Sequence, residues 1–592
     1  MAQLIQPFCA EYREIMKSFA DLKKNLKLDT SKLSLVKVAL LGDSSTQFLG
    51  VAIKGAGYDS GLDVQLWEAD FNQIERQVFD PTSELYSCNP EFVIIFFSTH
   101  KLLNRYNKLV PADQTAFAQA HLELIENIAN TIAENNRAKI ICYNYPELDD
   151  GVFGNFANSI EASFLYQLRY INLELMRMAQ KRKGFHICDL STIQNRFGKQ
   201  IMFHSPVYIN TEMTISLDTL PWVAQRTIDI IAAQTGRFKK CLILDLDNTL
   251  WGGIIGDDGI ENIQIGNLGI GKAFSELQYW IKKLKNRGII LCVCSKNTES
   301  IAKEPFENHP DMVLREDDIS VFMANWDNKA DNIRLIREIL NIGFDSMVFI
   351  DDNPFERNMV RENIPEITVP ELPEDPAEYL EYLYGLNLFE TVGISENDSE
   401  RTRQYQTEAK RISVSKSFVN EDDFLISLEM LSLVEGFNKF NTPRIAQLSQ
   451  RSNQFNLRTV RYSEADVAEM AVMTGYHNFS FSLEDKFGDH GLICTVIMKS
   501  ISDKELFIDT WFMSCRVLKR SMENFVMNTI AEYAGENGFK EIIGEYIPTP
   551  KNDIVKNHYR DLGFSESDNR WILDITQYAA RKTFINRKKV RA

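Results

Sequence analysis

The chain has 592 residues, with 82 acidic side chains, 65 basic ones and a net charge of −17. This length predicts several domains, and a hydrophobic content of 44% is enough for several cores. The acidic balance argues against nonspecific nucleic-acid binding, which needs a basic face, and every apolar run is too short for a membrane span.

Residues 1–235 alternate between strand-like and helical patterns. Apolar runs predict strands at 36–41, 92–97, 139–143 and 185–188, and amphipathic stretches between them predict helices. This alternation predicts a parallel sheet with helices on both faces, a three-layer α/β/α domain.

A Gly-Asp-Ser triplet follows the first predicted strand and places Ser44 at a strand-to-helix turn. The triplet resembles the opening motif of SGNH hydrolases, in which this serine is the nucleophile. The family's Gly-x-Asn-Asp and Asp-x-x-His motifs are missing, and His204 has no aspartate three residues before it. Since a serine without a base is a poor nucleophile, we expect an SGNH-like recognition domain without hydrolase activity. The plainer interpretation of residues 43–46 is a helix cap.

Residues 236–392 begin with two carboxylates at the end of a strand. Asp245 and Asp247 follow the apolar run 241–244, and strand alternation predicts that both point the same way. Two neighbouring carboxylates repel each other unless a cation lies between them, and oxygen ligands suit Mg²⁺. An acidic turn that only caps a helix is the alternative.

Three later segments favour a site over a cap. Ser295 ends the strand-like run 289–294, Lys329 begins a helical pattern, and Asp351 and Asp352 follow the run 347–350. Ligands of parallel α/β sheets bind where the strands end, so these side chains should converge. A carboxylate nucleophile, a hydroxyl and an ammonium for phosphate oxygens, and a metal site are what phosphoryl transfer requires.

The stretch from Asp245 to Thr249 reads Asp-x-Asp-x-Thr and resembles the first motif of the haloacid dehalogenase (HAD) superfamily of phosphohydrolases. The resemblance implies that Asp245 is the nucleophile and that Asp247 is the general acid/base, which also gives Mg²⁺ a backbone carbonyl. It also assigns phosphate binding to Ser295 and Lys329. Asp351 and Asp352 would complete the metal site. The Gly-rich stretch 252–269 and one helix are too short for a large cap, so we expect an open site.

Longer strings at 244–259, 294–297 and 350–357 resemble the FkbH-like family of HAD subfamily IIIC. Enzymes of that family load a glyceryl group from 1,3-bisphosphoglycerate onto an acyl carrier protein. The resemblance implies an acyl phosphate that loses phosphate while its acyl group passes to a thiol, on a carrier that acts in trans. Cys294 is the thiol best placed to accept the group, and a buried core cysteine is the alternative.

Residues 393–592 change in character after a polar linker. The predicted order is three antiparallel strands, a helix, a strand and a helix, at 479–483, 492–498, 506–512, 521–537, 541–546 and 554–562. This order resembles the core of GNAT acyltransferases. The stretch 557–564, with Asn557 and Tyr559, is also similar to that family's last motif.

The turn before helix 521–537 departs from the GNAT pattern, because lysine and serine stand at its glycine positions. Glycine there lets backbone N–H groups approach a phosphate at the helix start. Arg516, Lys519 and Arg520 still offer charge for the phosphate of CoA or of a carrier's phosphopantetheine, and an ordinary basic turn is the alternative. Acetyl transfer from CoA is therefore the less favoured activity.

The sequence favours a three-domain α/β enzyme with boundaries 1–235, 236–392 and 393–592. We expect it to dephosphorylate an acyl phosphate with Mg²⁺ and to load the acyl group onto an acyl carrier protein. One alternative is a phosphatase of a small phosphorylated metabolite with non-catalytic flanking domains, and another is a binding scaffold of inactive enzyme folds. Nine cysteines without zinc-type spacing and the lack of a secretion signal predict a cytoplasmic protein, without nucleic-acid or membrane partners.

Overall fold

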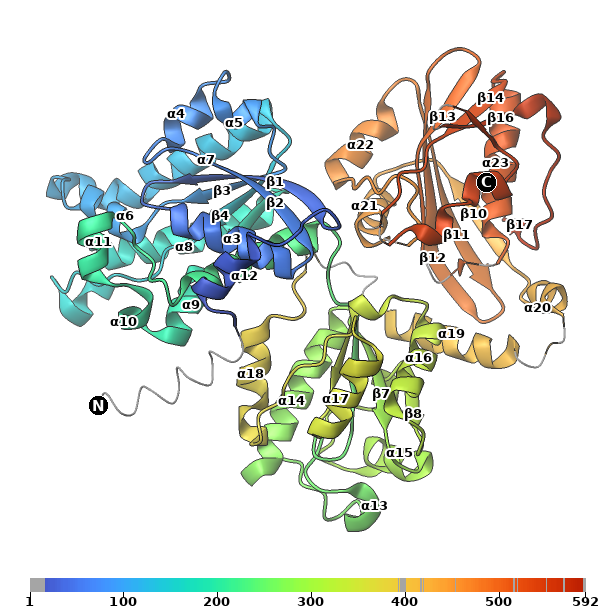
Figure 1. Ribbon diagram of the computed structural model, residues 1–592, viewed down its shortest axis with the longest axis horizontal. Helices are drawn as coiled ribbons and strands as arrows, with labels where there is room; N and C mark the ends of the chain where they lie inside the picture. Colours follow the sequence, from blue (N-terminus) through green and yellow to red (C-terminus); the bar gives the residue numbers. More distant parts are fainter. Residues whose placement is uncertain are drawn as a thin grey trace. The chain divides into compact units, whose positions relative to one another are not determined.

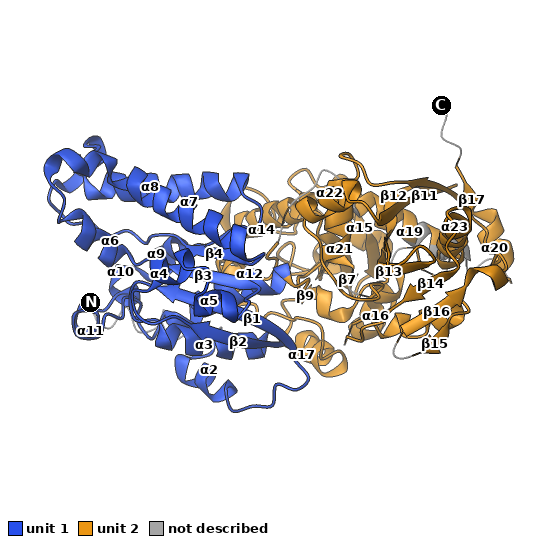
Figure 2. Ribbon diagram, turned by 90° about the horizontal axis from the view of Figure 1, so that it is seen from above, with its two compact units in different colours: residues 1–234 blue, residues 235–592 orange. Residues whose placement is uncertain are grey.

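The computed structural model describes residues 16–391, 393, 401–415, 418, 420–452, 454–514, 517–518, 520–549, 551–567 and 570–588. The chain divides into two compact units, 1–234 and 235–592, which Figure 2 shows in two colours. The predicted division of the second unit at residue 392 stays a prediction. Among the described helices, none combines the length and the apolar character needed to cross a membrane.

The first unit contains a parallel five-stranded sheet of order β2-β1-β3-β4-β5 (Figure 1). Its strands are β1 (Ser34–Gly42), β2 (Leu62–Glu68), β3 (Phe92–Phe96), β4 (Lys139–Tyr143) and β5 (Phe185–Cys188). Helices α3 (Gln47–Asp59) and α12 (Leu220–Gln234) pack on one face, and α7 (Phe117–Asn135) and α8 (Phe164–Lys181) pack on the other. Each face has its own apolar core, so the predicted three-layer arrangement is present.

Shorter helices connect the strands of this unit. They are α2 (Phe19–Asn25), α4 (Ile74–Phe79), α5 (Glu84–Ser87), α6 (Thr99–Tyr106), α9 (Leu190–Phe197), α10 (Lys199–Met202) and α11 (Ser205–Thr211). The apolar-run patterns missed β2, because this edge strand alternates apolar and polar side chains and is only partly buried.

The second unit begins with a parallel four-stranded sheet of order β8-β7-β6-β9. The strands are β6 (Cys241–Leu244), β7 (Ile290–Ser295), β8 (Val321–Ala324) and β9 (Met347–Ile350). Its helices are α13 (Ile255–Asp258), α14 (Gly269–Asn286), α15 (Glu299–Asn308), α16 (Lys329–Leu340), α17 (Pro354–Asn363) and α18 (Tyr379–Leu386). Separate cores form on the two faces, and the parallel strands end at one edge of the sheet.

The rest of the second unit has a mixed eight-stranded sheet of order β15-β16-β14-β13-β12-β11-β10-β17. Its strands are β10 (Leu431–Glu435), β11 (Tyr476–Asp485), β12 (Gly488–Ser500), β13 (Glu505–Met513), β14 (Glu541–Gly544), β15 (Ser565–Ser567), β16 (Arg570–Asp574) and β17 (Asn586–Arg587). Its helices are α19 (Arg401–Ser415), α20 (Glu421–Ser427), α21 (Thr442–Arg451), α22 (Glu464–Val472), α23 (Met522–Glu536) and α24 (His558–Asp561).

Helix α23 covers one face of this sheet, and α21 and α22 cover the other. Strands β11, β12 and β13 are antiparallel, whereas β14, which follows α23, pairs in parallel with β13. The predicted order of strands and helices is therefore found, and the predicted mixed α/β fold class is confirmed.

Candidate active site

Three aspartates converge where two neighbouring strands of the four-stranded sheet end. Asp245 follows β6, Asp351 and Asp352 follow β9, and the backbone N–H of Asp245 donates to the carbonyl of Ile350 at 3.0 Å. One carboxylate oxygen from each aspartate lies within 4.8 Å of the others. The edge of the sheet thus gathers these acids as the sequence predicted.

Lys329 joins this cluster from the first turn of α16. Its Nζ lies 2.9 Å from Asp245 Oδ1 and 2.6 Å from Asp351 Oδ2, and the side chain is almost fully buried. Burial alone would lower the pKa of Lys329, but the two carboxylates raise it above its ordinary value. Lys329 therefore stays cationic and balances part of the negative charge.

The cluster suits a divalent cation. Burial and the charge of Asp245 raise the pKa of Asp351 to about 7 and that of Asp352 to about 6. Asp245 Oδ1 is buried and accepts no well-directed hydrogen bond from the described residues, although Lys329 lies close to it. A donor set of carboxylate oxygens matches the preference of Mg²⁺, and such an ion would relieve the repulsion among the three acids.

The carboxylate of Asp247 is not one of the three that converge, and hydrogen bonds to both of its oxygens fix its orientation. Strand β6 ends at Leu244, so alternation no longer governs residue 247. Its Oδ1 accepts from Trp251 Nε1 and from the backbone N–H of Ile255, each at 3.0 Å, and its Oδ2 accepts from Asn297 at 3.1 Å. Burial raises its pKa. The expected contribution of its backbone carbonyl to the metal stays a prediction.

Three side chains that the sequence patterns did not single out fix the acids in place. The Thr249 hydroxyl accepts from the backbone N–H of Asp352 at 3.1 Å. Arg357 donates to the carbonyls of Asp351 at 2.9 Å and Asp352 at 2.6 Å, and Asn297 holds Asp247. All three lie inside the strings that carried the family resemblance, but only the folded geometry gives them positioning roles.

Ser295 and Cys294 end strand β7 side by side and have different surroundings. Both are buried, and the backbone of Ser295 holds the loop before Lys329 by accepting from the N–H of Asn325 at 3.2 Å. Cys294 is fully buried in the apolar core, its Sγ donates to the carbonyl of Lys329 at 3.6 Å, and burial raises its pKa. This geometry contradicts the acyl-acceptor role of Cys294, because an incoming acyl group cannot reach the thiol.

Ser44 lies at the end of β1 in the first unit, and its side chain is buried without a hydrogen-bond partner among the described residues. His204 does not serve as its base, since its Nδ1 accepts the backbone N–H of Val207 at the start of α11. The neighbouring Asp43 accepts the backbone N–H of Ser98 at 2.9 Å. The expected SGNH likeness of this domain and its lack of hydrolase activity stay predictions.

Of the predicted pantetheine-binding residues, Arg516 and Lys519 lie outside the described residues. Arg520 is buried, pairs with Glu408 at 2.6 Å and contacts His490 at 3.2 Å. Its guanidinium is thus engaged inside the protein, which contradicts a role in phosphate binding.

The remaining residues of this group are Asn557 and Tyr559. Asn557 is exposed at the start of α24, and Tyr559 is buried against Phe564 and Trp571. Their predicted roles in pantetheine binding stay predictions.

Comparisons with known proteins agree with this geometry. Residues 37–232 match the family model described as FkbH, N-terminal domain. The N-terminal part of the protein BF1531 from Bacteroides fragilis, containing a phosphatase domain complexed with Mg, is 57% identical with a TM-score of 0.62. The match covers 64% of this chain and all of that one.

The C-terminal region matches acetyltransferase structures only distantly. The ribosomal-protein-S18-alanine N-acetyltransferase of Escherichia coli is 15% identical, with a TM-score of 0.20 over 25% of this chain and 96% of that one. The GNAT domain of S. lividans PAT is 17% identical, with a TM-score of 0.19 over 24% and 89%. No curated protein matches the chain. From its extensive identity with the phosphatase-domain structure, the chain belongs to the FkbH-like family of the HAD superfamily and is an enzyme of the HAD phosphatase type.

Proposed function

We propose that the second unit carries a Mg²⁺-dependent site that removes a phosphoryl group from an acyl phosphate or another small phosphoester. The observation that carries this proposal is the convergence of Asp245, Asp351 and Asp352 on one point, with Lys329 in contact with two of them. These three carboxylates would hold the ion. When bound, Mg²⁺ supplies charge neutralisation for the phosphate oxygens.

The residues of the chain then have separate roles. Lys329 and Ser295 hold the transferred phosphoryl group while an Asp245 oxygen attacks phosphorus and the bond to the leaving oxygen breaks. Asp247, which Asn297 and Trp251 hold in one orientation, gives a proton to that oxygen. It then takes a proton from the water that attacks the aspartyl phosphate, which releases inorganic phosphate and restores Asp245.

The finer proposal is transfer of a glyceryl group from a 1,3-bisphosphoglycerate-like acyl phosphate to an acyl carrier protein. Because Cys294 is enclosed, the carrier's own thiolate must attack the acyl carbon directly. The bond from that carbon to the phosphate oxygen then breaks, and Ser295 and Lys329 hold the departing phosphate. This step leaves a 3-phosphoglyceryl group on the carrier, and hydrolysis of its remaining phosphate through Asp245 gives the glyceryl group. This route needs an approach from solvent. Two exposed aromatic side chains follow the strand ends of this edge, Trp326 in the loop after β8 and Phe355 in the first turn of α17.

A specific observation favours the simpler phosphatase as the second candidate. Asp257 and Asp258 in helix α13 and Asp327 in the loop after β8 are exposed, and they add negative charge to the segments that follow β6 and β8. An acidic carrier would meet repulsion there, whereas a small metabolite neutralised by Mg²⁺ would not.

Reaction in H₂¹⁸O separates the two candidates. The full chain is incubated with 1,3-bisphosphoglycerate, Mg²⁺ and a phosphopantetheinylated carrier, and the masses of the carrier and of the released phosphate are measured. Transfer predicts a carrier heavier by one glyceryl group, with equal amounts of unlabelled phosphate from the acyl position and ¹⁸O-labelled phosphate from the 3-position. Hydrolysis alone through Asp245 predicts only ¹⁸O-labelled phosphate and an unchanged carrier. The proposal as a whole fails if Mg²⁺ stimulates neither reaction or if Asp245→Asn retains both.

A further inference from the structure

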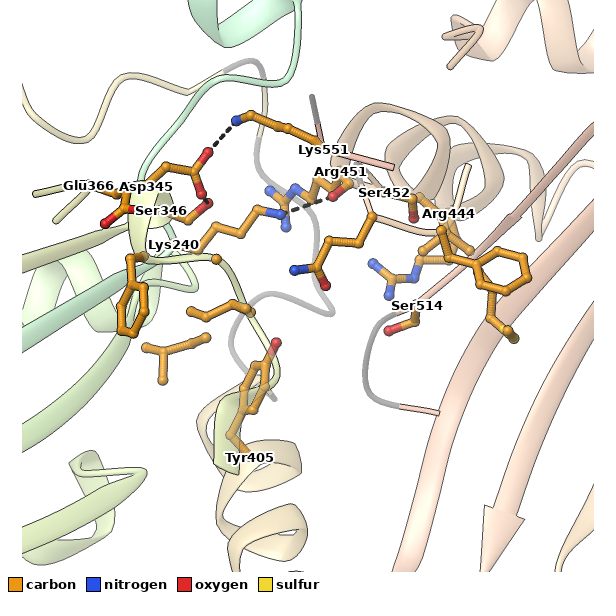
Figure 3. Close-up of a pocket in the computed structure, with 18 residues that line it drawn as sticks. Lys240, Asp345, Ser346, Glu366, Tyr405, Arg444, Arg451, Ser452, Ser514 and Lys551 are labelled. Carbon is orange, nitrogen blue, oxygen red and sulfur yellow. Dashed lines mark hydrogen bonds and ion pairs between the residues drawn. The ribbon is translucent and has the colours of Figure 1, made fainter. Parts of the chain in front are cut away.

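A cavity of about 390 Å³ lies at the edge of the four-stranded sheet opposite the aspartate cluster (Figure 3). Lys240, which lines it, precedes strand β6, whereas Asp245 follows that strand. Strand β6 has four residues, and such a strand spans about 13 Å. The cavity is therefore separate from the candidate active site. Helix α21 and the end of β13 form its other walls.

The cavity has an excess of positive charge. Four cationic side chains line it, and two acidic ones do. The cationic residues are Lys240, Arg444, Arg451 and Lys551, and the acidic residues are Asp345 and Glu366. Lys551 pairs with Asp345, and Lys240 donates to the carbonyl of Arg451 at 3.0 Å. Figure 3 shows Lys551 extending to Asp345 and Lys240 extending toward Arg451. In a chain of net charge −17, this excess is a local reversal of sign.

The pKa values of neighbouring groups report the same positive potential. Burial opposes ionisation of Asp345, yet Lys551, Lys240 and Lys239 together lower its pKa. Burial lowers the pKa of Lys239 to about 8. The charge of Asp345 acts to raise this pKa, whereas the charge of Lys551 acts to lower it. An anion in the cavity would favour the charged forms of these lysines.

The remainder of the lining is largely apolar. Leu448, Phe455 and Met513 are almost fully buried side chains on one wall, and Ile342 is buried on the other. Small-molecule sites combine such apolar surface with a few charged groups and typically have volumes of about 300–1,000 Å³. The cavity thus has the size and composition expected for a small organic anion.

We propose that this cavity is a second ligand site, which takes an organic phosphate whose remaining part is apolar. A phosphate dianion offsets the excess of cationic lining residues, and arginine binds phosphate with paired hydrogen bonds. The apolar part of the ligand packs along the apolar side of the lining, where the ring of Phe344 is only partly buried. This inference does not depend on the reaction proposed for Asp245.

The test is isothermal titration calorimetry of the full chain with phenylphosphonate, which a phosphatase cannot hydrolyse, in buffer with EDTA. EDTA removes the metal that the active site needs to attract an anion. We expect one molecule to bind per chain, at least about tenfold more tightly than inorganic phosphate, because the phenyl ring buries apolar surface. Arg444→Gln and Lys551→Gln should each weaken binding by about fivefold or more through loss of a charged hydrogen bond.

Two control variants locate the site. Lys556→Gln removes an exposed charge five residues beyond Lys551 and should leave the affinity unchanged, as should Asp245→Asn at the active site. Thermal melting of every variant confirms that it is folded. The proposal is overturned if phenylphosphonate does not bind, if inorganic phosphate binds equally well, if the two cavity variants bind normally, or if Asp245→Asn abolishes binding.

Discussion

In each of the two parallel sheets, a buried aspartate follows an interior strand. At only one of these two sheet edges do further candidate catalytic side chains lie beside it. Asp43 follows β1 and uses its carboxylate to accept the backbone N–H of Ser98. Asp245 follows β6 and meets two further aspartates and Lys329. Within the described residues, three potential metal ligands converge only at the second edge. The end of a strand therefore places one side chain. Whether a catalytic site forms depends on which side chains the neighbouring strands place beside it.

The strongest test of this comparison replaces each aspartate by asparagine. Asp245→Asn should lower Mg²⁺-dependent phosphate release by on the order of a thousandfold or more, because it removes the nucleophile. Asp43→Asn should change the rate less than about twofold. Burial already raises the pKa of Asp43 to about 6, so a neutral side chain fits there and keeps an oxygen for Ser98. Equal losses in the two variants, measured as initial rates, would contradict the distinction.

Lys329→Met should lower the rate by about a hundredfold or more, because a positioned cation that stabilises the transferred group is lost. The change also leaves three carboxylates without their buried counter-charge. We therefore expect the melting temperature of the variant to fall in EDTA and to recover with Mg²⁺ more than that of the unchanged protein. A variant with normal activity would remove Lys329 from the mechanism.

Removal of one metal ligand sharpens the metal assignment. Asp351→Asn should raise the Mg²⁺ concentration that gives half-maximal activity by at least about tenfold. The stabilisation that saturating Mg²⁺ gives the unchanged protein, about 2.7 kcal/mol at a hundred times the dissociation constant, should shrink accordingly. Thermal melting across a Mg²⁺ titration measures this stabilisation in the variant and in the unchanged protein. If the melting temperatures of the two proteins depend on Mg²⁺ in the same way, Asp351 is not a ligand.

Thr249→Val tests positioning at a distance from the substrate. It keeps the shape of the side chain but removes the hydroxyl that accepts from the backbone of Asp352. We expect the Mg²⁺ concentration that gives half-maximal activity to rise about tenfold, with a smaller loss of activity at saturating Mg²⁺. Thr298→Val, at an exposed position after β7, is the matched control and should leave the Mg²⁺ dependence unchanged.

We expect the smallest effects at Cys294 and Ser44, which the sequence offered as a candidate acyl acceptor and a candidate nucleophile. Cys294→Ala and Ser44→Ala should each leave phosphate release and any glyceryl transfer within about twofold. Cys294→Ala should cost about 1–2 kcal/mol of stability, since it leaves a small cavity in the core. Loss of glyceryl transfer alone in Cys294→Ala, as seen by intact mass of the carrier, would restore the acyl-acceptor role.

The sequence predicted the convergence of Asp245, Lys329 and Asp351 because strand order and strand ends translate directly into position. Each of these residues lies at the start or end of a strongly patterned element. The position of Ser295 beside them stays a prediction. Side-chain direction was less predictable. Alternation along β7 and the depth of the core decide that Cys294 is enclosed, and the turn after Leu244 decides that Asp247 faces Trp251.

Other features depend on contacts between distant segments. The four-residue strand β8 has only two fully buried side chains, so its pattern was too weak to detect. The partnership of Arg520 with Glu408 joins residues far apart in the sequence, and His490 is buried beside them. The basic cavity likewise forms only because α21 and β13 lie opposite the residues that precede β6 and β9.

The most direct test of the central claim is a crystal structure of the full chain grown with Mn²⁺ in place of Mg²⁺ and with beryllium fluoride, which mimics a bound phosphoryl group. We expect an anomalous peak held by oxygens of Asp245, Asp351 or Asp352, and a beryllium fluoride on Asp245 in contact with Lys329. A metal bound elsewhere, or an unmodified Asp245 beside an ordered metal, would contradict it.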